Sequence, residues 1–230
     1  MKVEVFDLGM IDYGKALEMQ RGLVKSLTMN ENIDREILLL LEHPHVITLG
    51  RSTTTQNFRE QPIPVYQVER GGDATYHGPG QLVGYPIFHL RDHDVKRLVN
   101  GIEEVLIRSV KHFGIVAERK EGHRGVWVSI NGNKKKLASI GIAVSNWVTY
   151  HGFALNVNTD LSYFGLINPC GLPSEMLTSM ERILGKKTDM QEVKKRVIEE
   201  FGTVFDAEIE ISRAEPAFLA FERLKINVDE

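Results

Sequence analysis

The chain has 230 residues and a single cysteine, whose neighbours are unusual for a residue that only fills a core. Cys170 stands in Asn168-Pro169-Cys170-Gly171, between a proline that fixes the backbone and a glycine that lets a substrate come close. A lone cysteine cannot form an intrachain disulfide, so its value lies in reactivity or in burial. Cys170 is therefore a candidate nucleophile, with a small buried hydrophobic residue as the alternative.

A second candidate for chemistry is a glycine-rich segment, Arg70-Gly71-Gly72-Asp73-Ala74-Thr75-Tyr76-His77-Gly78-Pro79-Gly80-Gln81. Its glycines let the main chain approach a ligand and present amide groups, which predicts a binding loop. Arg70 and His77 could then position a carbonyl group or the phosphate of a carrier. A tight structural turn with a hydrogen-bonded histidine explains the same residues, and the Gly-Lys-Ser/Thr ending of a phosphate-binding P-loop is absent.

A lysine follows the clearest local pattern in the chain, a hairpin that turns at Asn131-Gly132 and continues as a strand from near Lys135. Strict alternation gives that strand two faces. One face holds Lys136, Ala138, Ile140, Ile142 and Val144, and the other holds Lys135, Leu137, Ser139, Gly141 and Ala143. Lys136 is then either an edge lysine whose amine reaches solvent, or a partly desolvated amine with a lowered pKa that can take a proton or stabilise a thiolate.

The histidines give weaker signals. His151 shares the apolar face of the strand predicted over 148–157, which favours a core histidine over a catalytic one. His43 and His45 have no third ligand at the spacing of a zinc site, so we expect a loop with incidental imidazoles and no metal.

The elements that must position these residues do not alternate regularly between helix and strand. We therefore predict an α+β fold with a mixed or antiparallel sheet and packed helices. Apolar spacing and caps predict helices over 13–27, with Asp12 as cap, over 98–113, and over 190–201, with Asp189 as cap. Strands are predicted over 3–8, 36–41, 46–49, 65–68, 126–130, 137–144 and 148–157, and a strand plus a short helix over 206–230.

Composition limits the class of protein. With 42% hydrophobic residues, residues 1–230 can bury one substantial core, so a single domain is expected. The formal net charge of −3 argues against nonspecific nucleic-acid binding. The start of the chain lacks the pattern of a signal peptide, and no apolar run is long enough to span a membrane, which predicts a soluble cytoplasmic protein.

Four separated motifs together resemble the lipoyl(octanoyl) transferases. They are Arg70-Gly71-Gly72-Asp73-Ala74-Thr75-Tyr76-His77-Gly78-Pro79-Gly80-Gln81, Lys136-Leu137-Ala138-Ser139-Ile140-Gly141, His151-Gly152-Phe153-Ala154-Leu155-Asn156 and Asn168-Pro169-Cys170-Gly171. The resemblance extends from Glu42-His43-Pro44 to Thr178-Ser179-Met180, and so covers most of the chain.

This resemblance implies a fold related to the catalytic domains of biotin and lipoate protein ligases. It also implies transfer of an octanoyl (or lipoyl) group from acyl carrier protein to a lysine of a lipoyl domain, the first step of endogenous protein lipoylation. The implied acceptors are the lipoyl domains of 2-oxoacid dehydrogenase complexes and the glycine cleavage H protein. Neither ATP nor another cofactor is implied, because the acyl group arrives on phosphopantetheine, and no nucleic-acid or membrane partner is expected.

Position by position, the resemblance makes Cys170 the acyl-thioester cysteine and Lys136 the lysine that lowers its pKa. The residues that match the family's substrate-binding segments are Arg70, Gly71, Gly72, Asp73, Ala74, Thr75, Tyr76, His77, Ser139, Ile140, Gly141, Gly152, Phe153 and Ala154. Three positions depart from the family: Ala74 replaces a common valine, and Ala143 and Asn146 stand where many members carry arginine. The missing arginines put affinity for acidic carrier proteins in doubt.

Three rival functions stay open. A ligase of the same fold would activate a free acid with ATP and need no nucleophilic cysteine. A non-catalytic protein would bind lipoyl domains or acyl carrier protein without being acylated. A thioesterase would share the acyl-cysteine but use water as the acceptor. Without the resemblance, the residues themselves indicate only an acyltransferase or hydrolase that uses a cysteine and a lysine.

Overall fold

One mixed β-sheet organises the molecule. The computed structural model describes residues 1–29, 35–53, 62–167 and 176–212. Within these residues, eight strands form a sheet in the order β11-β1-β2-β6-β10-β9-β8-β7, in which β1 runs parallel to β2 and β11 and the other neighbours are antiparallel. This arrangement confirms the predicted α+β class with a mixed sheet. The strands are β1 (Lys2–Met10), β2 (Glu36–Glu42), β6 (Gln81–Ile87), β7 (Ala117–Lys120), β8 (His123–Ile130), β9 (Asn133–Ser145), β10 (Val148–Asn156) and β11 (Glu208–Ser212).

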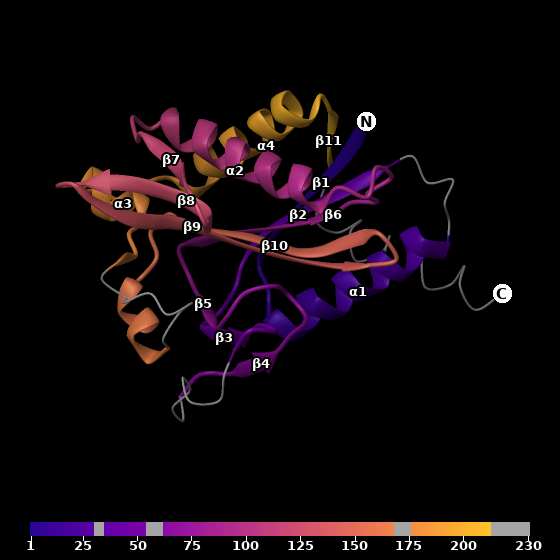
Figure 1. Cartoon of the computed structure of the whole chain (residues 1–230), viewed down its shortest axis with the longest axis horizontal. Helices are drawn as coiled ribbons and strands as arrows, with labels where there is room; N and C mark the ends of the chain where they lie inside the picture. The colour runs from indigo at the N-terminus through magenta and orange to yellow at the C-terminus, as the bar shows by residue number, and fades with distance from the viewer. Residues whose placement is uncertain (30–34, 54–61, 168–175, 213–230) are drawn as a thin grey trace.

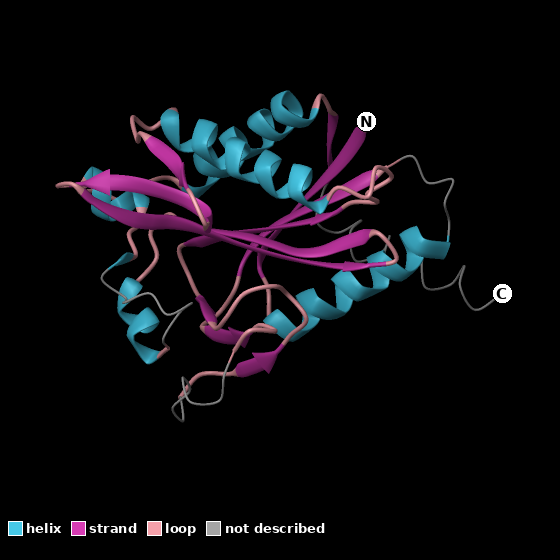
Figure 2. Cartoon of the chain, in the orientation of Figure 1, coloured by secondary structure: helices cyan, strands magenta, loops and turns pink. Residues whose placement is uncertain are grey.

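Helices cover both faces of this sheet. In Figures 1 and 2, α2 (Val95–Lys111) and α4 (Met190–Phe205) lie on one face, and α1 (Tyr13–Met29) lies on the other. The short helix α3 (Met180–Leu184) precedes α4. None of the helices in the described ranges is long and apolar enough to cross a membrane.

A smaller sheet lies on the same side as α1 (Figure 1). It contains β4 (Val65–Gln67), β3 (Val46–Leu49) and β5 (Thr75–His77), in that order. The 3-10 helix η2 (Leu161–Leu166) packs against it through Phe164, which shares a buried cluster with Ile47 and Tyr76. The loop that leads into β5 is the predicted binding loop, so the small sheet places that loop beside the large one.

The alternation of strand β2 explains the two-layered core. Leu38 and Leu40 belong to the cluster beneath α2 and α4, whereas Leu39 and Leu41 belong to the cluster beneath α1. Successive side chains of a strand point to opposite faces, so a run of leucines is buried on both sides. A fully apolar strand therefore lies at the centre of the sheet, with a helix layer on each face.

The predicted helices and the predicted hairpin are present. Asp12 caps α1 by accepting a hydrogen bond from the N–H of Lys15 (3.1 Å), and Asp189 caps α4. Asn131 and Gly132 have φ values of 50° and 77°, as a two-residue hairpin turn requires. The strand after 206 is confirmed as β11, whereas the helix predicted after it falls in 213–230, outside the described residues.

The predicted faces of β9 are wrong at Lys136. Trp127 of β8 pairs with Lys136, but the preceding Val126 pairs with Ala138, so Leu137 is an extra residue that forms a β-bulge. Leu137 and Ala138 both join the core beneath α2, and Lys136 turns to the opposite face. Moreover, β9 lies inside the sheet, which excludes the interpretation of Lys136 as an edge lysine.

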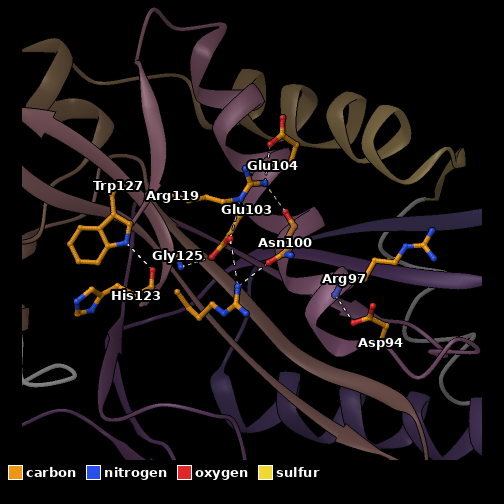
Figure 3. A network of polar contacts seen from close by, with 10 residues as sticks. Asp94, Arg97, Asn100, Glu103, Glu104, Arg119, His123, Gly125 and Trp127 are labelled. Atoms are coloured by element: carbon orange, nitrogen blue, oxygen red, sulfur yellow. Dashed lines mark hydrogen bonds and ion pairs between the residues drawn. The ribbon is translucent and has the colours of Figure 1, made fainter. Parts of the chain in front are cut away.

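A buried carboxylate attaches helix α2 to the outer strands β7 and β8 (Figure 3). Glu103 accepts a hydrogen bond from the N–H of Gly125 (3.0 Å) and forms an ion pair with Arg119 (3.2 Å). Arg119 also pairs with Glu104 (2.9 Å) and donates to the carbonyl of Asn100 (3.0 Å). These contacts fix the part of β8 that faces Lys136.

We predict that Glu103→Ala lowers the free energy of unfolding by about 2–4 kcal/mol, because it leaves the N–H of Gly125 and one charge of Arg119 without their buried partner. Glu104→Ala is the matched control: this carboxylate is partly exposed and should cost less than about 1 kcal/mol. Urea denaturation of both variants measures the difference. Equal losses would show that the buried carboxylate has no special role.

Candidate active site

A pocket lies where the glycine-rich loop meets β9 and β10, on the face of the sheet that α1 covers. It holds about 700 Å³ of empty space, part of it open to solvent. The predicted site residues that line it come from three segments far apart in the sequence: Arg70, Gly71, Gly72, Ala74, Thr75 and His77; Lys136, Ser139, Ile140 and Gly141; and Gly152, Phe153 and Ala154. The structure thus brings together three of the four motifs that the sequence singled out.

Glycines allow the loop to lie directly on the sheet. The N–H of Gly71 donates to the carbonyl of Ile142 in β9 (3.2 Å). A Cβ atom on Gly141 would lie 3.0 Å from the carbonyl oxygen of Gly71, and one on Gly152 would lie 2.0 Å from that of Gly84. Side chains at these positions would push the loop away from β9 or split β10 from β6, so the wall of the pocket depends on their absence.

Arg70 is fixed by the small sheet. Its Nη2 donates to the carbonyl of Thr48 (2.7 Å), and its Nε donates to the Thr48 hydroxyl (3.1 Å). The guanidinium is buried, and Arg70 is one of the residues that line the pocket. Thr48 thus anchors a positive charge at the edge of the site.

Lys136 lies over an aromatic ring. Its Nζ is 5.3 Å from the centre of the Trp127 ring, and the Nζ of Lys120 is 4.5 Å from the same centre. Gly125 makes room for this arrangement, because a Cβ atom there would lie 3.0 Å from Cε of Lys136. The ring attracts the ammonium form of lysine, so Trp127 helps to hold the Lys136 amine in place.

Cys170 lies in 168–175, outside the described residues. The described residues on either side, Ile167 and Leu177, belong to the same buried cluster. Leu177 forms a parallel bridge with Lys136, and the N–H of Thr178 donates to the Lys136 carbonyl (3.0 Å). The chain that follows the cysteine motif is therefore attached to the strand that carries Lys136.

Two other predicted residues do not line the pocket. Asp73 accepts a hydrogen bond from the N–H of Ala74 (2.7 Å) and so shapes the loop. Tyr76 is fully buried, its hydroxyl bonds Nδ1 of His45 (2.7 Å), and its ring stacks on Tyr163 (5.2 Å between centres). Tyr76 supports η2 rather than the pocket itself.

Sequence reasoning did not place five pocket residues in the site: Tyr13, Tyr85, His151, Phe164 and Leu177. Tyr85 belongs to a buried chain in which Nδ1 of His43 bonds the carbonyl of Ile11 (2.7 Å) and Nε2 bonds the Tyr85 hydroxyl (2.7 Å). His43 is thus not an incidental loop imidazole. The sequence signal for His43 was its place in Glu42-His43-Pro44, where the family resemblance begins, but that match assigned His43 no chemical role.

His151 is buried, as expected, yet it also lines the pocket. Its φ of 56° turns the backbone N–H out of the ladder toward α1, where it donates to Oε1 of Gln20 (2.7 Å). Its Nε2 lies 3.8 Å from Oε2 of Glu69. Burial and the positive charge of Arg70 lower the pKa of His151 to about 4, so the ring is neutral near pH 7.

Within the described ranges, no three His, Cys, Asp or Glu side chains form a group that could hold a metal ion. The described residues that line the pocket include one lysine, one arginine, two neutral histidines, four residues with hydroxyl groups (Tyr13, Thr75, Tyr85 and Ser139), and apolar or glycine walls.

Residues 12–202 match the family model of the lipoyl protein ligase A/B catalytic domain. The chain belongs to this family. An octanoyltransferase of Desulforamulus reducens is 45% identical over 221 residues, which cover 92% of this chain and 94% of the relative. The matched range contains every described motif of the pocket.

Solved structures share the fold of this lipoyl protein ligase A/B domain. A bi-partite lipoate protein ligase from Thermoplasma acidophilum superposes with a TM-score of 0.74 at 16% identity, covering 96% of this chain and 92% of that one. Biotin protein ligase from Aquifex aeolicus in complex with biotin and ATP gives 0.51 at 14% identity, covering 90% and 71%. At these identities the likeness concerns the fold alone, and it confirms the fold that the motifs implied.

The buried histidines predict a pH dependence of stability. Burial lowers the pKa of His43 to about 4 in the folded protein, whereas in the unfolded chain the pKa of this ring is near 6.5. Between these two values the unfolded state binds a proton that the folded state does not. The free energy of unfolding must therefore fall as the pH falls through this window, by about 1.4 kcal/mol per pH unit for this ring.

We predict that His43→Asn flattens this dependence by about one proton, because its carboxamide can still donate to Ile11 but does not titrate. Urea unfolding across the acidic range measures the slope. The exposed Gln191, which does not titrate, is the control, and Gln191→Asn should leave the slope unchanged. An unchanged slope in His43→Asn would mean that this ring is protonated in the folded protein.

Proposed function

We propose that this protein is an octanoyltransferase, an acyltransferase that modifies lipoyl domains. The observation that carries the proposal is the position of Lys136, which a β-bulge turns into a pocket walled by glycines and apolar side chains. The 45% identity to a relative with this activity supports the same reaction. An apolar pocket suits an eight-carbon chain, since each buried methylene contributes about 0.8 kcal/mol.

In the proposed first half-reaction, the Cys170 thiolate attacks the carbonyl of octanoyl-phosphopantetheine on acyl carrier protein. A new carbon–sulfur bond forms on Cys170, and the carrier leaves as its thiol. In the second half-reaction, the amine of a lipoyl-domain lysine attacks the acyl-cysteine. An amide forms, and the Cys170 thiol is released. No ATP is consumed, because a thioester is already activated toward an amine.

Lys136 is proposed to control the protons of both steps. A neighbouring ammonium group favours the thiolate of Cys170, and a lysine can then take a proton from the attacking amine and return it to the departing sulfur. The attachment of Leu177 and Thr178 to the backbone of Lys136 supports the pairing, since it ties the chain after the cysteine motif to the same strand.

Several finer points stay predictions: acyl carrier protein as the donor, lipoyl domains of 2-oxoacid dehydrogenase complexes and the glycine cleavage H protein as acceptors, a cytoplasmic location, and a single domain over residues 1–230. The bi-partite lipoate protein ligase from Thermoplasma acidophilum belongs to a lipoylation system with an E2 lipoyl domain, which supports the first class of acceptor.

The proposal is tested by intact mass. The protein is incubated with octanoyl-acyl carrier protein without ATP, and an apo lipoyl domain is then added. We expect an octanoyl adduct on the protein that moves to the lipoyl domain. Acylation that needs free octanoate and ATP would point to a ligase, and release of free octanoate instead of transfer would point to a thioesterase.

We predict that Cys170→Ser and Lys136→Ala each abolish detectable transfer while the thermal transition stays close to that of the wild type. The matched control is Lys135→Ala, because Lys135 is the neighbouring residue and does not line the pocket. It should keep most of the activity. If Lys136→Ala lost its thermal transition but its folded fraction kept the normal specific activity, Lys136 would be structural and the dyad would be wrong.

A further inference from the structure

A series of hydrogen bonds links the binding loop, through both main-chain polar groups of Thr178, to the main chain of Lys136. Nδ1 of His77 bonds Oε1 of Gln81 (2.8 Å), and Nε2 of Gln81 donates to Oδ1 of Asn156 (3.0 Å). Nδ2 of Asn156 donates to the carbonyl of Thr178 (3.0 Å), whose N–H donates to the carbonyl of Lys136 (3.0 Å). The three side chains His77, Gln81 and Asn156 are all buried.

The donors and acceptors of these hydrogen bonds can be assigned in one way only. The carbonyl of Thr178 is an acceptor, so Asn156 must present its NH₂ there and its oxygen to Gln81. Gln81 must therefore present its NH₂ to Asn156, and the same group also donates to the Tyr76 carbonyl (3.3 Å). The amide oxygen of Gln81 then faces His77, so Nδ1 of His77 has to carry a proton.

The remaining nitrogen of His77 is an acceptor. Burial, with further contributions from His43, Arg70 and His151, lowers the pKa of His77 to about 3, so its ring is neutral near pH 7. A neutral imidazole with a proton on Nδ1 has a lone pair on Nε2. His77 lines the pocket, and Nε2 has no hydrogen-bond partner in the part of the chain that the structure describes. The sequence suggested that His77 positions a carbonyl group or a phosphate. With its Nδ1 proton used by Gln81 and no proton on Nε2, however, His77 has no N–H to donate to such a group.

We propose that Nε2 of His77 accepts a hydrogen bond from the amine of the acceptor lysine during the second half-reaction. This inference rests on the proposed function and names a further catalytic residue for it. An octanoyl chain has no N–H or O–H group, so the donor has to belong to the carrier or to the acceptor. The amine is favoured because in the proposed reaction it passes its proton to Lys136, and the hydrogen bonds above join His77 to the main chain of Lys136.

The role of such a contact is orientation. Holding one amine N–H aims the nitrogen lone pair at the carbonyl carbon of the acyl-cysteine. As carbon–nitrogen bond formation and carbon–sulfur cleavage proceed, the amine proton passes to Lys136 and then to the sulfur. His77 does not take this proton, because its buried ring disfavours the imidazolium form. Gln81 and Asn156 are positioning residues that select the tautomer.

Two substitutions of His77 separate its two nitrogens. In His77→Asn, the carboxamide NH₂ occupies the place of Nδ1 and can still donate to Gln81, but the acceptor at the place of Nε2 is lost. In His77→Gln, the carboxamide reaches the place of Nε2 and can still accept. We expect the ratio of the second to the first half-reaction rate constant to fall about tenfold in His77→Asn and to fall less in His77→Gln.

The tautomer is tested separately by ¹⁵N NMR of the imidazole rings in the whole protein. The signals of His77 are assigned among the eight histidines by their loss in His77→Asn. We expect a protonated Nδ1 and an unprotonated Nε2, with no titration near pH 6.5. In Gln81→Glu, the new carboxylate should stabilise the imidazolium, so both nitrogens carry protons and the rate ratio falls as in His77→Asn.

Other results would overturn the inference. A proton on Nε2 in the wild type would remove the acceptor. A loss confined to the first half-reaction in His77→Asn would assign the contact to the amide N–H of phosphopantetheine, and an unchanged ratio would leave His77 without a role. If the wild type formed no acyl adduct, the proposed function and the amine contact would both fail, while the NMR result would still decide the tautomer.

Discussion

The site depends on one extra residue in strand β9. Without the bulge at Leu137, Lys136 would point into the apolar core beneath α2, where burying its ammonium group would cost free energy. With it, two consecutive apolar residues enter the core and the lysine faces the pocket. The amine of Lys136 then lies over the ring of Trp127, and Gly125 leaves room for the Lys136 side chain. Glu103 of helix α2 fixes Gly125 by accepting a hydrogen bond from its N–H. The bulge in the sheet thus places Lys136 in the pocket.

The pocket is shaped by close main-chain contacts and by neutral polar groups. Glycines at 141 and 152 let the loop and the strands approach one another without side chains between them. Behind this wall, His43 and His77 are buried and uncharged, and their hydrogen bonds are used to fix Tyr85 and Gln81. Such groups cost little to bury when they are paired, and because they are neutral they add no further positive charge to those of Lys136 and Arg70.

Local patterns predicted most of the fold from the sequence. Helix caps, the Asn131-Gly132 turn and apolar runs depend on neighbouring residues, so the helix predicted over 13–27 and the strand predicted over 137–144 were located. Strand β6, which lies inside the large sheet, and the short strands β5 and β7 were not predicted. The motifs placed the loop, Lys136 and Gly152 in one site. What failed was the face of Lys136, because a bulge is set by pairing with Trp127, which alternation along one strand does not reveal. Tyr13 and Tyr85 were missed since only tertiary contacts bring them to the pocket.

The same fold in lipoate and biotin ligases shows that the architecture does not choose the reaction. A choice between an activated thioester and a free acid has to come from the few groups at the pocket. In this chain the described groups include one amine over an aromatic ring, a fixed arginine and a histidine whose Nε2 accepts a hydrogen bond. Among the described residues that line this pocket, none is a carboxylate, which would form an ion pair with an amine and hold it in the ammonium form.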